Sequence, residues 1–590
     1  MCGIFGYVGE KRDAAEAVRE GLKRLDYRGY DSWGVCVAKD KEISLLKQVG
    51  IIGTDKLTLP GASVGIGHTR WATHGKVNEI NAHPHFSTDQ SFVLAQNGIA
   101  ENADTLKMQL VKDGYKFISE TDTEVIVRLV EKKLKKAKSL EDAVRQAFKD
   151  LTGRNTIIVM TADGDVIAAR NGSPLVLGMD KHMNELYFSS DVFSFAPHVE
   201  RVLVLENGEM AVCKDHTLSL SVIATGKKIK PVFETNKLKD VSTSKEPHAH
   251  YMIKEIREAP AVIRQVAQEE DKKIMELARA IKQARTVYCI GSGTAGAAAA
   301  QTAYYLRVYG GIRAEALIGA ESGDYRALIG KGDLLIAPSQ SGETADVLEV
   351  LEWAKSRKAK IASFVNMPGS MMTRLSDYKF MANAGPEICV MSTKIFVSQI
   401  AWGYLVSKAV QGKLDDGKKK LRALAKHIET YLANPEHEHS LRALAADLAK
   451  KKHIFLLGKG QNLQIMKEAM VKMIEGSYIH AHAIPAGDLK HYAITLMEEG
   501  VSVLTAISED DTKADVLNAV HQVRARGAEV TGVASEPSAH FASFIQVPNT
   551  GETSAIMHII PLQLLAYEMA CSLGHNVDKP RNIAKSVTVK

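Results

Sequence analysis

The sequence predicts an α/β protein of several domains, and three observations support that fold class. The first part of the chain, to about residue 225, alternates short β segments with a few helices. From about residue 285 onward, a strand, a glycine-rich turn and a helix recur in that order, which is typical of a parallel sheet covered by helices. The length of 590 residues corresponds to about four domains of about 150 residues each.

The composition excludes several classes of protein. Hydrophobic residues make up 45% of the chain and charged residues 24%, which is ordinary for a soluble globular protein. The net charge of +6 is too small over this length to indicate nucleic-acid binding. No uninterrupted apolar run reaches the roughly 18 residues that a membrane-spanning helix needs. We therefore expect a multidomain soluble enzyme that binds neither nucleic acid nor a membrane.

The cysteines indicate a compartment and one candidate nucleophile. The six cysteines form no CxxC pair and no zinc-type cluster, so we expect free thiols, a reducing compartment and no bound metal. The N-terminal segment lacks the basic start and apolar stretch of a signal peptide, so a cytoplasmic location is expected by default. Cys2 follows the initiator methionine, and removal of Met1 would place its thiol beside a free α-amine.

Residues 2–225 are predicted to form a first domain rich in strands. Alternating and β-branched segments predict strands at Ile4–Val8, Gly34–Ala38, Ser63–Ile66, Phe92–Ala95, Thr156–Met160 and Val202–Leu205. The spacing of apolar residues predicts helices over Ala14–Leu25 and Thr123–Leu134. Residues 226–260 become polar and lysine-rich, and we interpret them as an interdomain linker.

The second half of the chain contains an internal repeat. The segment VYCIGSG at Val287–Gly293 matches IFLLGKG at Ile454–Gly460, 167 residues later. Two copies are too few for a solenoid and predict two similar α/β subdomains with parallel sheets. The predicted divisions are a first subdomain at 261–415, a helical connection at 416–445, a second subdomain at 446–575 and a C-terminal loop at 576–590.

Cys2 is a candidate nucleophile, because an N-terminal thiol can use its own α-amine as the base, with a pKa of about 7.7–8.0. Taken alone, Cys2 is better explained as a small residue that permits removal of Met1. The motifs that follow it reverse this preference: GIFG at 3–6, YRGYDS at 27–32, HTRWATHG at 68–75, NAHPH at 81–85, QNGIAEN at 96–102, SETDTE at 119–124 and GSPLV at 172–176. In this order they resemble the class II glutamine amidotransferases, the N-terminal-nucleophile glutaminases. The resemblance implies an αββα fold and glutamine hydrolysis at Cys2.

Glutamine is a zwitterion, so its site needs one fixed cation and one fixed anion. Arg70 offers a bidentate fork for the carboxylate, and Asp122 suits the amine. Attack of the thiol on the amide creates an oxyanion, for which the Asn97 side chain and the Gly98 backbone N–H are the expected donors. Outside this pattern, Arg70 or Asp122 would be interpreted as a surface charge.

The resemblance also assigns residues around this pocket. Trp71 resembles the family's gate residue, a bulky lid over the active centre, and Thr73 and His74 are expected to line the same pocket. Gln96 departs from the family, in which histidine is usual at this position. Because glutamine also forms hydrogen bonds, we expect Gln96 to tune the site rather than abolish it.

The segment SQSGET at 339–344 is a candidate phosphate cradle without a lysine. It precedes a helix predicted to start near Ala345, whose N-terminus offers free N–H groups and a positive dipole end. The alternative is an ordinary serine-rich capped turn. A second turn, GSGT at 291–294, and the STK motif at 392–394 complete a pattern that resembles the sugar isomerase (SIS) domain, whose ligand is a phosphosugar. The cradle residues implied are Ser292, Ser339, Gln340, Ser341, Thr344 and Val390.

The glycines at 291, 293 and 296 also satisfy the spacing of a dinucleotide-binding turn. No acidic residue closes the expected second strand about twenty residues on, where one would hold a ribose. We therefore expect no cofactor.

The predicted helix over Gln461–Gly476 carries two stripes of side chains. Leu463, Met466, Met470 and Met473 form an apolar core stripe, and Glu468, Lys472 and Glu475 form a charged stripe roughly opposite to it. The charged stripe is ordinarily a solvated face with weak ion pairs. Here the helix leads into GSYIHAHAIPAGDLKH, which resembles the isomerase domain of the glucosamine-6-phosphate synthase family.

That resemblance implies catalytic roles in the second half of the chain. Glu475 would be the base that moves a proton between C1 and C2 of the sugar, Lys472 would orient it, and His491 would act in ring opening. The C-terminal segment DKPRNIAKSVTVK also resembles the family, with Lys585 as the lysine that meets the sugar carbonyl as a Schiff base. The departures from the family's pattern are Ile474, His482 and Tyr492–Ala493.

The resemblance spans nearly the whole chain. It implies an enzyme that hydrolyses glutamine, passes ammonia inside the protein and converts fructose 6-phosphate to glucosamine 6-phosphate, as a homodimer whose sites are shared across the interface. Two alternatives remain: a deglycase or deaminase acting on phosphosugars, and a non-enzymatic phosphosugar sensor built on SIS domains. The deglycase would need no glutaminase half, and the sensor should lack Glu475, Lys472 and Lys585.

Overall fold

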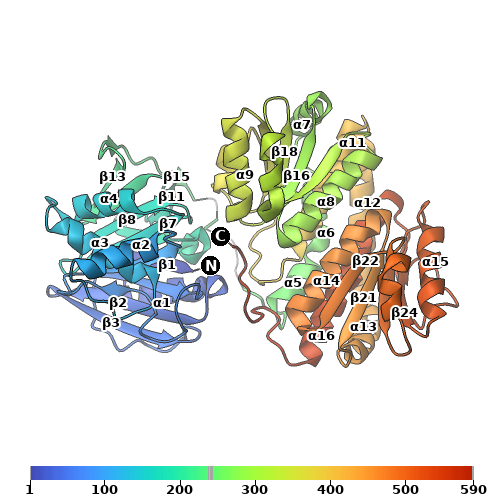
Figure 1. Cartoon of the computed structure of the whole chain (residues 1–590), viewed down its shortest axis with the longest axis horizontal. Coiled ribbons are helices and arrows are strands. Elements are labelled where there is room, and N and C mark those ends of the chain that lie inside the picture. The colour runs from blue at the N-terminus through green and yellow to red at the C-terminus, as the bar shows by residue number, and fades with distance from the viewer. Residues whose placement is uncertain (1, 183, 237, 240–243, 588–590) are drawn as a thin grey trace. The chain divides into compact units, whose positions relative to one another are not determined.

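The structure is a computed structural model of the chain, and it describes residues 2–182, 184–236, 238–239 and 244–587. The chain divides into two compact units, Met1–Ser242 together with Ala584–Lys590, and Thr243–Ile583. Both units combine helices and sheets, as the sequence predicts (Figure 1).

The described part of the first unit contains two antiparallel sheets. The eight-stranded sheet has the order β15-β11-β9-β10-β1-β4-β2-β3. Its strands are β1 (Gly3–Gly9), β2 (Ser32–Lys39), β3 (Glu42–Val49), β4 (Val64–Arg70), β9 (Val176–Met179), β10 (Glu185–Ser189), β11 (Arg201–Val204) and β15 (Glu234–Thr235). The seven-stranded sheet has the order β14-β13-β12-β8-β7-β6-β5. Its strands are β5 (His85–Phe86), β6 (Phe92–Gly98), β7 (Asn155–Thr161), β8 (Val166–Asn171), β12 (Glu209–Lys214), β13 (Thr217–Val222) and β14 (Lys228–Ile229).

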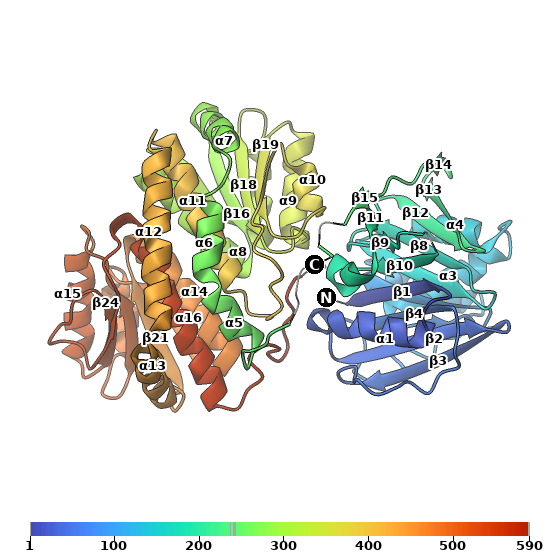
Figure 2. The same cartoon turned by 180° about the vertical axis from the view of Figure 1, so that it is seen from behind.

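Helices cover the outer face of each sheet, which makes a four-layered αββα unit. The helices are α1 (Ala14–Arg24), α2 (Ala103–Lys112), α3 (Asp122–Leu134) and α4 (Leu140–Asp150). Between the sheets lies a core that includes Ile4 of β1 and Ile158 of β7. On the far side of the seven-stranded sheet, a second core joins that sheet to α2, α3 and α4. Figure 2 shows α1 against the other sheet, where it packs on β1 and β4.

A glycine permits the close approach of α1 to β1. A Cβ atom on Gly21 would lie 2.2 Å from the ring of Phe5, which is closer than real Cβ contacts occur. Phe5 therefore fills the groove of the helix, while its neighbour Ile4 points to the core between the sheets, as the alternation of a strand requires.

Residues 226–260 contain regular structure that their polar composition does not reveal. Strand β14 extends the seven-stranded sheet beside β13, and β15 extends the eight-stranded sheet beside β11. Further on, α5 (Tyr251–Arg257) is the first helix of the second unit. The two strands have two residues each, which is too short for an alternating pattern to appear in the sequence.

The second unit contains two five-stranded parallel sheets of the same topology, which confirms the repeat. The first sheet has the order β17-β16-β18-β19-β20 and the second the order β22-β21-β23-β24-β25. The strands are β16 (Val287–Gly291), β17 (Ala314–Ile318), β18 (Leu334–Ser339), β19 (Lys360–Val365), β20 (Tyr378–Met381), β21 (His453–Gly458), β22 (His480–Pro485), β23 (Ser502–Ala506), β24 (Glu529–Ala534) and β25 (Ser543–Gln546). The helices after α5 are α6 (Ala259–Val266), α7 (Asp271–Gln283), α8 (Gly293–Val308), α9 (Ala345–Ser356), α10 (Met371–Leu375), α11 (Lys394–Val410), α12 (Leu414–Ala433), α13 (Pro435–Leu448), α14 (Leu463–Ser477), α15 (Lys513–Arg524) and α16 (Ser554–Ser572).

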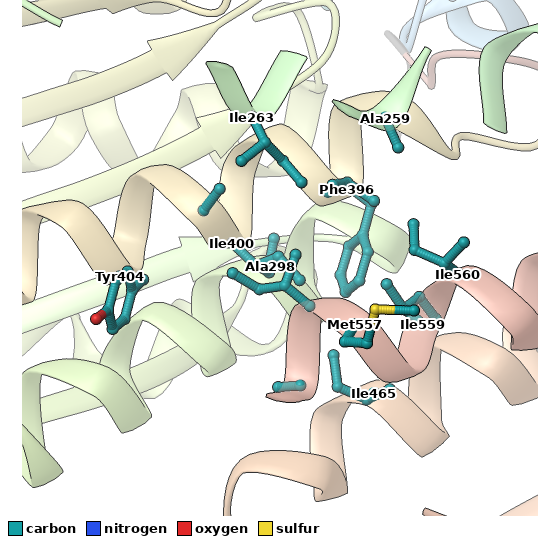
Figure 3. Packing of buried hydrophobic residues seen from close by; sticks show 14 of the residues in the cluster. Ala259, Ile263, Ala298, Phe396, Ile400, Tyr404, Ile465, Met557, Ile559 and Ile560 are labelled. Carbon is teal, nitrogen blue, oxygen red and sulfur yellow. The ribbon is translucent and has the colours of Figure 1, made fainter. Parts of the chain in front are cut away.

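One continuous apolar core joins the two repeats of the second unit. Figure 3 shows Ala298 of α8 and Phe396 of α11 beside Ile465 of α14 and Met557 of α16, so both repeats contribute to the same cluster. Among the described residues, one helical segment, Gly551–Ser572, is long and apolar enough to cross a membrane. Of its most apolar window, 94% is buried inside this unit, so packing in the core accounts for its apolar residues.

Candidate functional site

Cys2 lies directly before β1, beside the end of β4. Its sulfur accepts a hydrogen bond from the Trp71 backbone N–H at 3.3 Å and lies 3.5 Å from the Trp71 carbonyl oxygen. Burial raises the pKa of the Cys2 thiol, while the Trp71 backbone N–H and the positive charge of Arg70 act in the opposite direction. The strand pairing of Gly3 with Thr69 brings the predicted nucleophile next to the predicted glutamine-binding segment.

Arg70, the last residue of β4, is buried, and its guanidinium group forms hydrogen bonds with backbone carbonyls of the loop that follows β4. One guanidinium nitrogen donates to the Lys76 carbonyl at 3.2 Å, and the other donates to the carbonyls of His74 and Gly75. Thr73 lies exposed in this loop beside the exposed His74, with its Oγ1 3.2 Å from His74 Nδ1. Arg70 therefore shapes the loop in which the predicted pocket residues lie.

Asn97 and Gly98 end strand β6. The Asn97 amide donates to Ser190 Oγ at 2.8 Å, and its Oδ1 lies 3.2 Å from His68 Nε2. Gly98 has a φ of +125°, and a Cβ atom there would lie 2.0 Å from the Arg154 carbonyl oxygen. Only glycine fits this position, because a side chain would meet the backbone of Arg154.

Asp122 is the first residue of α3 and is buried. Its Oδ2 accepts hydrogen bonds from the Ala100 backbone N–H at 2.8 Å and from Gln96 Nε2 at 3.3 Å. Gln96, the departure noted in the sequence, is buried as well and precedes Asn97 on β6. The structure thus places the predicted amine-binding and oxyanion-binding residues on neighbouring segments.

The two glycine-rich turns lie at the same edge of the first parallel sheet, because β16 and β18 are parallel neighbours. Ser292 and Thr344 each precede a helix, α8 and α9 respectively, at its N-cap position. The Ser292 hydroxyl is buried and has no hydrogen-bond partner among the described residues. A Cβ atom on Gly319 would lie 2.7 Å from Ser292 Oγ and 2.8 Å from Val347 in the first turn of α9, so the two helix starts lie close together.

The SQSGET turn is held by its own hydroxyl groups. Ser339 Oγ accepts from the Gly342 N–H at 2.9 Å, and Ser341 Oγ accepts from the Glu343 N–H at 3.2 Å. The Gln340 carbonyl accepts from the backbone N–H groups of residues 366 and 367. This closed turn leaves the N-terminus of α9 without a side-chain cap, which fits the predicted phosphate cradle.

Val390 belongs to a loop that two buried glutamates hold. The Val390 N–H donates to the Asp578 carbonyl at 3.0 Å. Glu255 of α5 accepts from the backbone N–H groups of Ile388 at 2.5 Å and Cys389 at 3.2 Å. Glu387 accepts from the Thr393 N–H at 2.9 Å at the other end of the loop. The position of Val390 is therefore fixed by residues far from it in the sequence.

The charged stripe of α14 is buried, which contradicts the solvated-face alternative. Lys472 Nζ lies 2.5 Å from Glu475 Oε2 and 3.5 Å from Glu468 Oε1, and Thr294 Oγ1 donates to Glu468 at 3.2 Å. Glu468 and Lys472 have no exposed surface, and the Glu475 side chain is 24% exposed. Glu468, at one end of this row, thus contacts the GSGT turn of the first repeat.

Burial and the neighbouring charges together set the pKa values of Glu468 and Lys472. It raises the pKa of Glu468 to about 7, and the positive charge of Lys472 opposes that rise. Burial alone would lower the pKa of Lys472, but the two neighbouring carboxylates raise it overall. Lys472 is therefore a fixed cation, and Glu468 is the member whose proton exchanges near neutral pH.

Two predicted catalytic residues remain, His491 of the second unit and Lys585 of the C-terminal segment. His491 ends a single 3₁₀ turn, Leu489–His491, is exposed, and its imidazole forms no hydrogen bond with the described residues. Tyr492 and Ile474, two of the departures, are exposed at 47% and 40%. Lys585 is half-buried in the C-terminal segment that groups with the first unit. Within the described ranges, no group of three or more histidines, cysteines or carboxylates could hold a metal ion.

Known proteins resemble this chain in both of its units. The family model of the SIS domain matches residues 280–408 and 447–573, and that of the glutamine amidotransferase domain matches residues 68–196. The glutamine–fructose-6-phosphate aminotransferase (isomerizing) of Pyrococcus horikoshii is 35% identical over 604 residues, and that of Thermococcus kodakarensis is 36% identical over 620 residues. Each comparison covers 100% of both chains.

The chain belongs to the glutamine–fructose-6-phosphate aminotransferase (isomerizing) family. Among solved structures, the C-terminal domain of the glucosamine–fructose-6-phosphate aminotransferase from Francisella tularensis matches with a TM-score of 0.51 and 25% identity. The match covers 57% of this chain and 100% of that domain.

Several residues of this family member's sites escaped the sequence analysis. Arg28 donates from Nε to the Cys2 carbonyl oxygen at 3.3 Å and lies 3.6 Å from Asp191, which also accepts from the Tyr27 hydroxyl. The YRGYDS motif marked Tyr27 and Arg28 but gave them no role. The sequence also did not show that Thr294 contacts Glu468, because these residues are 174 positions apart, or that Glu387 accepts a hydrogen bond from the Thr393 N–H.

Proposed function

We propose that this protein hydrolyses glutamine, transfers the ammonia internally and converts fructose 6-phosphate to glucosamine 6-phosphate. One observation carries the proposal: a single chain combines Cys2 in an αββα glutaminase unit with a buried row of Glu468, Lys472 and Glu475 at a SIS-type sheet. A glutaminase alone would need no such row, and a sugar isomerase alone would need no N-terminal thiol.

In the glutaminase unit, the Cys2 thiolate attacks the side-chain amide of glutamine. Asn97 and the Gly98 N–H stabilise the oxyanion, ammonia leaves, and water hydrolyses the resulting γ-glutamyl thioester. Arg70 binds the α-carboxylate and Asp122 the α-ammonium group. The remaining pocket residues, which cover and line the site, are Trp71, Thr73 and His74.

In the second unit, hydroxyl groups and helix N-termini bind the phosphate of the sugar. The residues assigned to this subsite are Ser292, Ser339, Gln340, Ser341, Thr344 and Val390. Lys585 forms a Schiff base with the C2 carbonyl, and ammonia then displaces it to give the C2 imine. Glu475 moves a proton from C1 to C2, Lys472 orients Glu475, and His491 serves ring opening. The exposure of His491 is compatible with a role at the site of a second subunit in a homodimer.

The internal transfer of ammonia has a physical reason. Free ammonia is mostly protonated at neutral pH, and the ammonium ion is no nucleophile. A path closed to bulk water therefore preserves the reactive form. We place the reaction in the cytoplasm, where glutamine and sugar phosphates are both available to an enzyme with free thiols.

Product analysis tests this proposal most directly. The purified chain is incubated with glutamine and fructose 6-phosphate, and each is omitted in turn. We expect glucosamine 6-phosphate only when both are present, and glutamate release that depends on Cys2. The variant Cys2→Ala should release no glutamate and still isomerise the sugar. Formation of product from glutamine at the wild-type rate by Cys2→Ala would refute the nucleophile assignment.

A second variant separates the two halves. Lys585→Ala should lose synthesis of glucosamine 6-phosphate while it still hydrolyses glutamine. Conversion of glucosamine 6-phosphate without any use of glutamine would instead identify a deaminase. Binding of the phosphosugar without turnover would identify a sensor.

A further inference from the structure

We propose that Gln96 is a positioning residue that holds Asp122 in the orientation needed to recognise the α-ammonium group of glutamine. The inference rests on the proposed glutaminase activity and deepens it, because it names the device that selects a substrate with a free amine. It concerns a residue at which this chain departs from its family.

The amide group of Gln96 is buried and fully used. Its Nε2 donates to Asn155 Oδ1 at 2.7 Å and to Asp122 Oδ2 at 3.3 Å, and its Oε1 accepts from Thr123 Oγ1 at 2.6 Å. Both amide protons thus have an acceptor, and the carbonyl oxygen has a donor. A flipped amide would set oxygen against oxygen at both Asp122 and Asn155, so only one orientation is compatible with these neighbours.

The neighbours are oriented in turn. Asn155 donates from Nδ2 to the Thr152 carbonyl at 3.1 Å, which leaves its Oδ1 as the acceptor for Gln96. Thr123 has one hydroxyl proton, and it is donated to Gln96. The contact of 3.0 Å between Thr123 Oγ1 and His83 Nε2 therefore requires His83 to be the donor. The donor and the acceptor of each hydrogen bond are thereby fixed in the series His83, Thr123, Gln96 and Asp122.

His83 is suited to this role. Its ring packs against the tilted rings of His68 and His85, whose centroids are 4.3 Å and 5.1 Å away. Burial, together with these neighbouring rings, holds the pKa of His83 well below its usual range, so the ring is neutral. A neutral ring that donates from Nε2 carries no proton on Nδ1, and Nδ1 indeed has no partner among the described residues.

The consequence for Asp122 is that its two oxygens differ. Oδ2 accepts from the Ala100 N–H and from Gln96 Nε2, whereas Oδ1 has no hydrogen-bond partner in the described ranges of the chain. Asp122 is also the first residue of α3, so its backbone is fixed at the helix start, and the two hydrogen bonds to Oδ2 set the orientation of its carboxylate. Two donors on one oxygen leave the other directed to a cation such as an α-ammonium group.

The test compares L-glutamine with glutaramic acid, the same amide without the α-amine. Wild-type protein, Gln96→Met and Thr123→Val are compared by kcat/KM for release of ammonia from each substrate. Gln96→Met keeps the volume of the side chain and removes its hydrogen bonds. We expect it to lower the preference for L-glutamine over glutaramic acid about tenfold, mainly through KM, since hydrogen bonds to charged groups have about this effect. Thr123→Val, which removes the hydrogen bond to Gln96 Oε1 and so loosens the amide, should lower the preference about threefold.

Thr156→Val is the matched control. Thr156 is buried on the neighbouring strand, and its Oγ1 donates to the Ser173 carbonyl at 2.6 Å, the distance found for Thr123 and Gln96. Its loss removes an equivalent hydrogen bond without touching Asp122, so the preference should stay within twofold of wild type. An equal fall of kcat/KM for both substrates in Gln96→Met would show a merely structural role and overturn the inference. If Gln96→Met does not fold, an unchanged preference in Thr123→Val overturns it. Absence of glutamine hydrolysis in the wild-type protein would instead refute the proposed function itself.

Discussion

Replacement of Lys472 by methionine tests the charge row of α14. Lys472 Nζ lies between Glu475 at 2.5 Å and Glu468 at 3.5 Å, and both Lys472 and Glu468 are fully buried. Methionine keeps the length of the side chain and removes the charge. Removal of one partner from a buried ion pair costs about 3–5 kcal/mol, because the other charge remains uncompensated. Glu468 can reduce that cost by binding a proton.

The sign of the pH dependence follows from Glu468. Its folded-state pKa of about 7 is higher than that of an unfolded glutamate, so in the wild-type protein the folded state binds the extra proton below pH 7 and stability falls as pH rises towards 7. Without the opposing charge of Lys472, this pKa rises further. We expect Glu468 of the variant to stay protonated up to pH 8, so the stability of the variant continues to fall with pH. Wild-type Glu468 ionises near pH 7, and above that pH the stability of the wild-type protein no longer falls on its account. Integrated from pH 6 to pH 8, the difference grows by about 1.4 kcal/mol.

Urea unfolding of the full chain measures this difference. Hydrogen exchange of peptides from α14 and α16, analysed by mass spectrometry, isolates the second unit from the first. The double variant Glu468→Gln/Lys472→Met should lose the part of the excess pH dependence that Glu468 causes, because the amide introduced at position 468 does not titrate, while Glu475 is the same in both variants. Equal destabilisation of Lys472→Met at pH 6 and pH 8 would refute the assignment of Glu468 as the proton-exchanging member of the row.

Two further predictions concern glycines with no space for a side chain. Gly98→Ala should slow glutamine hydrolysis by about 10²-fold, the usual effect of losing one oxyanion donor, because its Cβ would meet the Arg154 carbonyl at 2.0 Å. Sugar isomerisation by the same protein is the internal control, and glutaminase activity near the wild-type level would contradict the geometry of Gly98. Gly403→Ala should destabilise the second unit by about 1–3 kcal/mol, since its Cβ would lie 2.3 Å from Thr302 Oγ1 and force α8 and α11 apart. Gly323→Ala, which meets no atom within 4 Å, is the control, and equal urea midpoints for the two variants would show that α8 and α11 can separate freely.

The sequence revealed those parts of the sites that lie within short segments. Cys2 and the turn at 339–344 could be predicted because motifs of adjacent residues define them. The repeat could be predicted because its two copies match at a spacing of 167 residues. The spacing of Met466 and Met473 also predicted their burial correctly, because helical periodicity depends only on local positions.

The sequence could not reveal contacts between distant segments. The buried Glu468 accepts a hydrogen bond from Thr294, which is 174 residues away, and periodicity alone does not show such a contact and favoured a solvated face. Glu255 accepts a hydrogen bond from the backbone N–H of Ile388, in the loop before Val390, and the two residues are 133 positions apart in the sequence. The short strands β14 and β15 were missed because hydrogen bonds to existing sheet edges, rather than their own residues, make them strands.

The shared core of the two repeats has a consequence for synthesis on the ribosome. Helix α16 is the last helix of the second unit, and its apolar residues complete a cluster that begins before Val287 of β16. At about 5–20 residues per second, translation from the first parallel strand to the end of α16 takes about 15–60 s. During that interval the apolar face that α16 covers has no partner, so we expect nascent chains of this length to depend on chaperones. All strands of the first unit's two sheets lie between Gly3 and Thr235, so we expect these sheets to pack together while the second unit is still being made.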